Sequence, residues 1–109
     1  GLGDAFLKHV ERTRLLVHVV DVSGAHGRDP LEDYRTVRRE MELYSEELLV
    51  RPQVVAANKI DRPEARARLP AFAEALAAEG VPVVAVSAAT GEGLEALKEK
   101  IADLLEGKP

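Results

Sequence analysis

The chain contains no cysteine, and its 109 residues include only two tyrosines, two phenylalanines and no tryptophan. The absence of cysteine excludes a disulfide scaffold, a thiolate metal site and a cysteine nucleophile. The shortage of aromatic rings argues against a stacking surface for single-stranded nucleic acid. Acidic side chains outnumber basic ones by 19 to 15, and the formal net charge of −4 argues against generic binding to nucleic-acid phosphates.

Long hydrophobic runs are also missing. No apolar stretch approaches the roughly 20 residues that a membrane-spanning helix requires, so we expect no membrane span. The first four residues, Gly1 to Asp4, do not resemble a signal peptide. Because the first residue is Gly rather than Met, we expect a processed product or a part of a longer protein. A length of 109 residues is enough for one hydrophobic core.

Three short apolar runs alternate with amphipathic stretches along the chain. The runs cover 15–20, 54–57 and 81–86, and they are rich in β-branched residues. Runs of this kind, without polar alternation, are typical of strands that are covered on both faces of a parallel sheet. Pro82 lies near the start of the third run, where its missing N–H is least harmful.

Helical spacing of apolar residues predicts one helix between successive runs and one at each end of the chain. The first helix is expected over about 3–13. The second begins with Asp29 as its N-cap and Pro30 as its first residue. The apolar stripe of this second helix consists of Tyr34, Val37, Met41, Tyr44 and Leu48.

The third and fourth helices follow the second and third runs. We expect an irregular segment over 62–68, then a helix with Pro70 in its first turn and Gly80 just past its end. The last helix is expected to have Thr90 as its cap, and its apolar stripe consists of Leu94, Leu97, Ile101, Leu104 and Leu105. The order of elements predicts an α/β fold, namely a three-stranded parallel sheet with flanking helices, as in all or part of a doubly wound sheet.

Polar residues follow the second and third runs at the point where each predicted strand ends. Asn58-Lys59-Ile60-Asp61 follows the second strand, and Ser87-Ala88-Ala89 follows the third. Ligands of open parallel sheets bind beyond the carboxyl ends of the strands. We therefore expect these two loops to lie side by side and to form a binding site.

The carboxylate of Asp61 suits a guanine base. Guanine presents two adjacent donors, N1–H and the N2 amino group, and one carboxylate can accept both hydrogen bonds. Adenine has no donor at N1 and would leave Asp61 partly unpaired, at a cost of ~1–3 kcal/mol. The pattern therefore favours guanine over adenine.

The neighbouring residues supply the remaining contacts of such a site. A backbone N–H in the loop of small residues over 87–89 can donate to O6 of guanine. Asn58 can bridge the base and nearby backbone, and the aliphatic stem of Lys59 can cover the ring face. Ser87 is placed to hydrogen-bond Asp61 and to hold its orientation.

The pattern N-K-x-D after one strand and S-A-x after the next resembles the base-recognition motifs of GTPases of the translation-factor and Ras-like class. Other segments narrow the resemblance to the Obg family of ribosome-associated GTPases, from just past switch II to the end of the G domain. Those segments are Gly1-Leu2-Gly3, Phe6-Leu7 and residues 9–13, 18–23, 27–30 and 87–93. The resemblance implies that residues 1–109 form a partial G domain with a P-loop GTPase (Ras-like) fold.

The resemblance also implies the site, the ligands and the partner. It places Asn58, Lys59, Ile60 and Asp61 against guanine, with the loop Ser87-Ala88-Ala89 closing over the base. The implied ligands are GTP and GDP, and Mg²⁺ is expected only in the intact protein. The intact family hydrolyses GTP and acts in assembly of the large ribosomal subunit, which implies a ribosomal partner and a cytoplasmic location.

The chain departs from the GTPase pattern at its phosphate-binding motifs. No G-x-x-x-x-G-K-[ST] string occurs, and a switch I threonine is lacking. Asp21-Val22-Ser23-Gly24 matches the D-x-x-G pattern of switch II, but a strand and a helix are missing between it and Asn58. We interpret Asp21 as a strand-end residue with local hydrogen bonds. We expect weak guanine binding, no catalytic residue and no hydrolysis by this chain alone.

Other charged residues have simpler interpretations. The histidines, His9, His18 and His26, show no pair at metal-ligand spacing on one helix, and His18 is expected to be a core residue. Three arginines lie beside the expected base site, where we interpret them as surface charge, with contact to nucleotide or RNA as the alternative. These are Arg62, Arg66 and Arg68.

Two further functions compete with guanine binding. One is a non-catalytic α/β interaction module that binds a protein or ribosomal partner without nucleotide. The other is a response-regulator-like domain, which requires an acidic cluster near the first strand, where only Asp21 and Asp29 are found. If the sheet is part of a larger one, the strand over 15–20 exposes an apolar edge, and we expect association, domain swapping or marginal stability.

Overall fold

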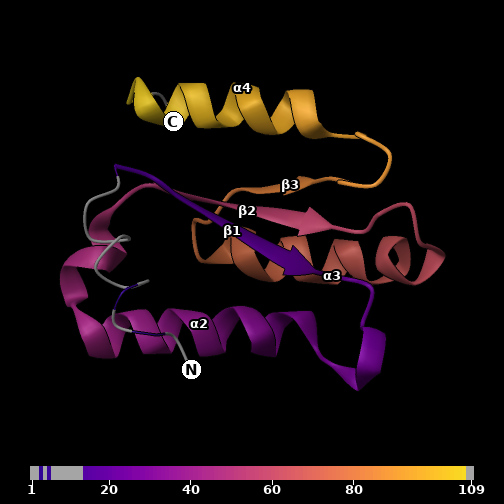
Figure 1. Ribbon diagram of the computed structural model, residues 1–109, viewed down its shortest axis with the longest axis horizontal. Helices are drawn as coiled ribbons and strands as arrows, with labels where there is room; N and C mark the ends of the chain where they lie inside the picture. The colour runs from indigo at the N-terminus through magenta and orange to yellow at the C-terminus, as the bar shows by residue number, and fades with distance from the viewer. Residues whose placement is uncertain (1–2, 4, 6–13, 108–109) are drawn as a thin grey trace.

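The computed structural model of the chain describes residues 3, 5 and 14–107 (Figure 1). Its centre is a three-stranded parallel sheet in the order β1-β2-β3. The strands are β1 (Leu16–Asp21), β2 (Gln53–Asn58) and β3 (Val83–Ala85). The predicted parallel sheet is confirmed, although β3 is shorter than the apolar run that predicts it.

Helices cover the sheet on both faces, as Figure 1 shows. Two of them, α2 (Pro30–Tyr44) and α3 (Pro63–Ala78), lie on one face, and α4 (Leu94–Leu105) lies on the other. Short 3₁₀ helices η1 (Ala25–Gly27) and η2 (Glu46–Val50) flank α2. The chain therefore has the predicted α/β architecture. Most of the helix expected over 3–13 lies outside the described residues.

The register of the strands brings their carboxyl ends to one edge of the sheet. Asp21 at the end of β1 is level with Asn58 at the end of β2, and Ala57 is level with Ala85 at the end of β3. A parallel sheet gathers the loops that follow such ends in one place. This edge is where the candidate site lies.

The three strands differ in how well they are covered. Residues 54–57 of β2 are buried on both faces, as the continuous apolar run predicts. In β1, Val17 is 40% exposed and Val19 is 59% exposed, while Val20 between the sheet and the helices is buried. The prediction that both faces are covered is therefore wrong for β1. Among the described residues, α4 packs over β2 rather than over β1.

The start of α2 is confirmed. The Asp29 side chain accepts a hydrogen bond from the Leu31 N–H at 3.2 Å, and Pro30 takes the first helical position. Its apolar stripe faces the sheet, but the helix ends at Tyr44 because Ser45 is extended and its hydroxyl caps η2 instead. Leu48, which was expected in the same stripe, lies in η2 instead, and its side chain is fully buried there.

The start of α3 corrects the expectation of an irregular segment over 62–68. The helix begins at Pro63, which occupies a first position that needs no N–H, and the buried Ala65 packs its first turn into the core. Pro70 lies inside the helix at an exposed position, and it has no N–H to donate to the Arg66 carbonyl one turn earlier.

The end of α3 and the start of α4 each lie beside a glycine with a positive φ. Gly80 has a φ of +77°, its N–H donates to the Ala77 carbonyl at 3.0 Å, and its predicted role as the end of α3 is confirmed. The expected cap of α4 is wrong. Gly93, with a φ of +78°, precedes the helix, whereas the Thr90 hydroxyl accepts from the Glu92 N–H within the loop.

The main core lies between the sheet and the pair α2 and α3. At its margin the His18 ring stacks on Tyr34, with ring centroids 5.1 Å apart. Burial, and to a lesser degree the charge of Arg38, lowers the pKa of His18. The stacking on Tyr34 and the burial of His18 thus favour the neutral form of a packed ring. The buried members of this core are Val20, Val22, Tyr34, Val55, Ala57, Ile60, Ala65, Phe72, Leu76 and Val81.

Candidate functional site

The loop after β2 is anchored at one residue and exposed at another. The Ile60 side chain is 3% exposed in the core, and its N–H donates to the Val86 carbonyl at 3.2 Å. One residue later, Asp61 is exposed. Ile60 thus fixes the loop, and any contact that it makes with a ligand is through its backbone.

The loops after β2 and β3 lie side by side, as expected, and two hydrogen bonds join them. The Ser87 hydroxyl donates to Asp61 Oδ1 at 2.9 Å, and the Ala88 N–H donates to Asn58 Oδ1 at 3.0 Å. Ser87 is fully buried, and its Oγ also accepts from the Thr90 N–H at 3.1 Å. The contact expected between Ser87 and Asp61 is therefore present.

The loop after β3 has its own internal support. The Ser87 N–H donates to the Glu92 carbonyl, and the Gly91 N–H donates to the Ser87 carbonyl, each at 2.8 Å. On the outer side, Arg66 of α3 forms an ion pair with the Glu92 carboxylate at 2.9 Å. Ala88 and Ala89 are exposed between these contacts. The loop therefore presents backbone and two methyl groups, with no bulky side chain of its own at this point.

Lys59 is held on the other side of the same loop. Its φ of +74° places it in the left-handed region, and its Nζ lies 3.0 Å from Asp21 Oδ2. Asp21 Oδ1 accepts from the Ser23 N–H at 2.8 Å and from the Ser23 hydroxyl at 2.7 Å. Burial alone would raise the pKa of Asp21, but these hydrogen bonds and the Lys59 charge outweigh it and lower the pKa to about 2.

The local hydrogen bonds expected at Asp21 are confirmed, and the ion pair with Lys59 is the contact that sequence reasoning missed. A signal for it exists in the sequence. If the apolar runs over 15–20 and 54–57 are aligned by their carboxyl ends, Asp21 falls beside Asn58, which is the register observed. The strand-end residues of adjacent parallel strands are neighbours even when no motif links them.

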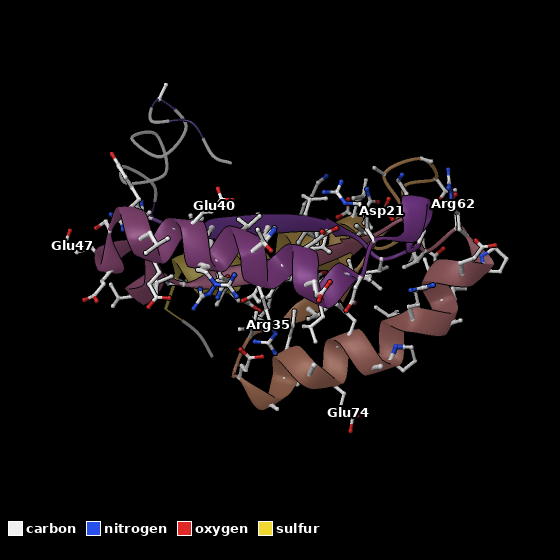
Figure 2. All side chains as sticks on the ribbon, turned by 90° about the horizontal axis from the view of Figure 1, so that it is seen from below. Asp21, Arg35, Glu40, Glu47, Arg62 and Glu74 are labelled. Carbon is white, nitrogen blue, oxygen red and sulfur yellow. The ribbon has the colours of Figure 1, made fainter. Side chains whose placement is uncertain are left out.

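The arginines near this edge are partly engaged with the protein itself. Figure 2 labels Asp21 and Arg62 toward the same end of the molecule. Arg66 is paired with the loop after β3, and the Arg68 guanidinium packs on Gly24, where a Cβ would lie 2.5 Å from its Cζ. For Arg66 and Arg68, these contacts favour the interpretation as surface charge with structural partners.

The described part of the chain offers neither a metal site nor a membrane-spanning helix. No group of three or more histidine, aspartate or glutamate side chains there is arranged to hold a metal ion. The acidic group at the strand ends, Asp21, is already paired with Lys59. No helix among the described residues is long and apolar enough to cross a bilayer.

Comparison with known proteins identifies the family. The chain is 50% identical over all of its 109 residues to GTPase Obg of Caldanaerobacter subterraneus and 51% identical over the same length to GTPase Obg of Bacillus licheniformis. The chain belongs to the Obg family. GTPase Obg of Alkaliphilus metalliredigens is 54% identical over 101 residues, or 93% of the chain. No family model matches the chain.

The similarity to Obg proteins covers a limited part of those relatives. The chain spans 26% of the length of the Caldanaerobacter protein, 25% of the Bacillus protein and 24% of the Alkaliphilus protein. The aligned segment nevertheless includes every residue of the two loops that form the candidate site, because the first two alignments run over the whole chain.

Proposed function

We propose that this chain is the guanine-recognition part of a GTP-binding protein of the Obg type, with residues 1–109 forming part of its G domain. The observation that carries the proposal is the pair of hydrogen bonds that joins Asn58 to Ala88 and Asp61 to Ser87. They bring together two loops that are far apart in the sequence but chemically suited to one base. The relatives named GTPase Obg support a guanine nucleotide as the ligand.

Asp61 carries the specificity in this proposal. Its carboxylate is exposed, yet one oxygen is oriented by the buried Ser87 hydroxyl. A carboxylate held in this way can accept hydrogen bonds from both N1–H and the N2 amino group of guanine. Adenine presents neither a donor at N1 nor an amino group at C2, so Asp61 would lose both bonds on binding it.

The other residues of the site shape and enclose the base. A backbone N–H of the loop Ser87-Ala88-Ala89 donates to O6, and the exposed small side chains leave room for the ring. Asn58 keeps this loop in place through its bond from the Ala88 N–H. The stem of Lys59 covers one ring face. Ile60 contributes its backbone only, because its side chain lies in the core.

The activity that we propose for the whole protein is supported by its resemblance to the Obg family rather than by these residues. We propose that the intact protein hydrolyses GTP, that it acts in the cytoplasm in assembly of the large ribosomal subunit, and that Mg²⁺ and phosphates are held by residues outside this chain. The 109 residues contain no G-x-x-x-x-G-K-[ST] string, whose backbone amides and hydroxyl supply those contacts in P-loop proteins.

The substitution Asp61→Asn tests the proposal. Xanthine carries a carbonyl oxygen where guanine carries its amino group, so an amide at position 61 can donate to it. We expect the chain to bind GDP in preference to XDP and ADP, and the Asp61→Asn chain to prefer XDP. The measurement is an NMR chemical-shift titration of each protein with the three diphosphates, which detects weak binding.

Asp103→Asn is the matched control, since it makes the same chemical change near the carboxyl end of α4. Its nucleotide preference should equal that of the unaltered chain. If neither the chain nor its Asp61→Asn variant distinguishes the three nucleotides, the base site is refuted. The alternative, an α/β module that binds a protein or ribosomal partner without nucleotide, is then favoured.

A further inference from the structure

Asp21 belongs to neither of the two loops proposed to contact guanine, yet it is joined to Lys59 across the ends of β1 and β2. We propose that Asp21 is a positioning residue of the base site, which fixes the ammonium end of Lys59 so that its stem is ordered before a base arrives. This inference rests on the proposed function, because it assigns the Lys59 stem to the ring face. It gives a role to a residue that the motif comparison leaves without one.

The Asp21 carboxylate is oriented independently of Lys59. Oδ1 accepts two hydrogen bonds from Ser23, at 2.8 Å from its N–H and 2.7 Å from its hydroxyl. Ser23 is 6% exposed, and its Oγ accepts in turn from the Ala25 N–H at 3.2 Å. Oδ2 is thus directed by a buried network, and it is this oxygen that lies 3.0 Å from Lys59 Nζ.

Lys59 is a residue whose backbone is fixed while its side chain requires a partner. The Val22 N–H donates to the Asn58 carbonyl at 3.3 Å, and the Ile60 N–H donates to the Val86 carbonyl at 3.2 Å, so the chain is held on both sides of it. Its own side chain is 39% exposed. A lysine stem has many rotamers in water, and their loss on binding weakens affinity unless the stem is ordered beforehand.

The ion pair between Asp21 and Lys59 orders the Lys59 side chain more than it stabilises the fold. Both of its side chains are more than a third exposed, at 39% and 37%, and partly exposed pairs contribute little to folding. Removing the pair should therefore leave the chain folded while it frees the Lys59 stem. A role in positioning and a role in folding thus predict different results.

The substitution Asp21→Asn distinguishes a role in positioning from a role in folding. The amide retains an oxygen that can accept both hydrogen bonds from Ser23, but it turns a donor group toward the Lys59 ammonium. We expect about 2-fold to 5-fold weaker GDP binding, the range typical of an exposed ion pair. In a Lys59→Met chain, which keeps a stem without the ammonium, Asp21→Asn should cause no further loss.

A control and a spectroscopic readout complete the experiment. Arg35→Gln removes an ion pair to Glu79 of similar exposure, 2.8 Å long and away from the strand ends, and should leave GDP affinity unchanged. NMR titration of the Asp21 carboxyl should give a pKa of about 2 in the unaltered chain and a higher value after Lys59→Met, because the Lys59 charge lowers it. If Asp21 had only a structural role, a change in the pKa of its carboxyl would not be accompanied by a change in GDP affinity.

The outcomes separate this inference from the proposed function. Unchanged GDP affinity after Asp21→Asn, in a chain that does bind GDP, overturns the positioning role and leaves the base site standing. Fully additive losses from Asp21→Asn and Lys59→Met overturn it as well, since the two residues would then act independently. If the unaltered chain distinguishes no nucleotide, the base site fails and the positioning role fails with it.

Discussion

Gly93 joins the loop after β3 to α4, and replacing it with alanine tests the geometry behind the candidate site. Its φ is +78°, a conformation that glycine adopts freely and that residues with a Cβ adopt at a cost. A Cβ built on Gly93 would overlap the carbonyl oxygen of Ala85 and would lie 3.1 Å from Val86 Cα. Both neighbours are backbone of β3 and its end, and they cannot move aside as the tip of a side chain can.

The expected loss of stability has two parts. The left-handed backbone costs a residue with a Cβ ~1–2 kcal/mol. Forcing a methyl group against fixed backbone adds ~1–3 kcal/mol, as overpacking does elsewhere. We therefore expect Gly93→Ala to reduce the free energy of unfolding by ~2–5 kcal/mol, from a total of ~5–15 kcal/mol for a domain of ordinary stability. The Tm should fall by ~10 °C or more.

Gly91→Ala isolates the first part of that loss. Gly91 has a φ of +87°, but a Cβ there would have no atom within 4 Å, so only the backbone cost of ~1–2 kcal/mol applies. Urea denaturation of the three proteins, followed by far-UV circular dichroism, measures the difference. Equal losses for Gly91→Ala and Gly93→Ala would refute the close approach of Gly93 to Ala85, and with it the observed path of the loop.

Two further predictions concern Ser87 and His18. Ser87→Ala removes the hydroxyl that orients Asp61 and satisfies the Thr90 N–H, so it should destabilise the chain by ~1–2 kcal/mol and weaken GDP binding. Ser45→Ala, which removes an exposed capping hydroxyl, should weaken only stability, and equal GDP affinities in all three proteins would contradict the role of Ser87. Burial lowers the pKa of His18 below 6.5, so its contribution to stability is complete above that pH and is lost as the pH falls toward its folded pKa. His18→Gln should therefore flatten the plot of unfolding free energy against pH below about pH 6.5, and an unchanged slope would show that His18 is not the group responsible.

The sheet and the two polar loops were predictable because both depend on local pattern and general topology. A continuous apolar run such as 54–57 is covered on both faces, and the polar residues that follow it fall at the carboxyl edge of a parallel sheet. The start of α2 at Pro30 and the end of α3 before Gly80 were likewise predictable, since each is fixed by one residue type in one position.

The predictions from sequence were wrong where the local sequence allows more than one structure and a tertiary contact determines which one forms. Pro63 and Pro70 each suit the first turn of a helix, and the burial of Ala65 in the core accompanies the start at Pro63. Thr90 is a good capping residue, but the close approach of Gly93 to β3 places the start of α4 three residues later. The exposed Val17 and Val19 of β1 depend on which strands α4 covers, and the apolar run itself does not encode this.

The same dependence on tertiary contacts explains how two exposed loops acquire a definite shape. Each loop contains one buried residue next to its exposed polar or backbone groups: Ile60, 3% exposed, precedes Asp61, and Ser87, fully buried, precedes Ala88. The core therefore fixes the position of each loop, and two hydrogen bonds join the loops to one another. Since the cost of ordering these groups is met during folding, a base that fits them gains affinity from contacts alone. Selectivity for the base should then be as stable as the core itself, and the two should be lost together on unfolding.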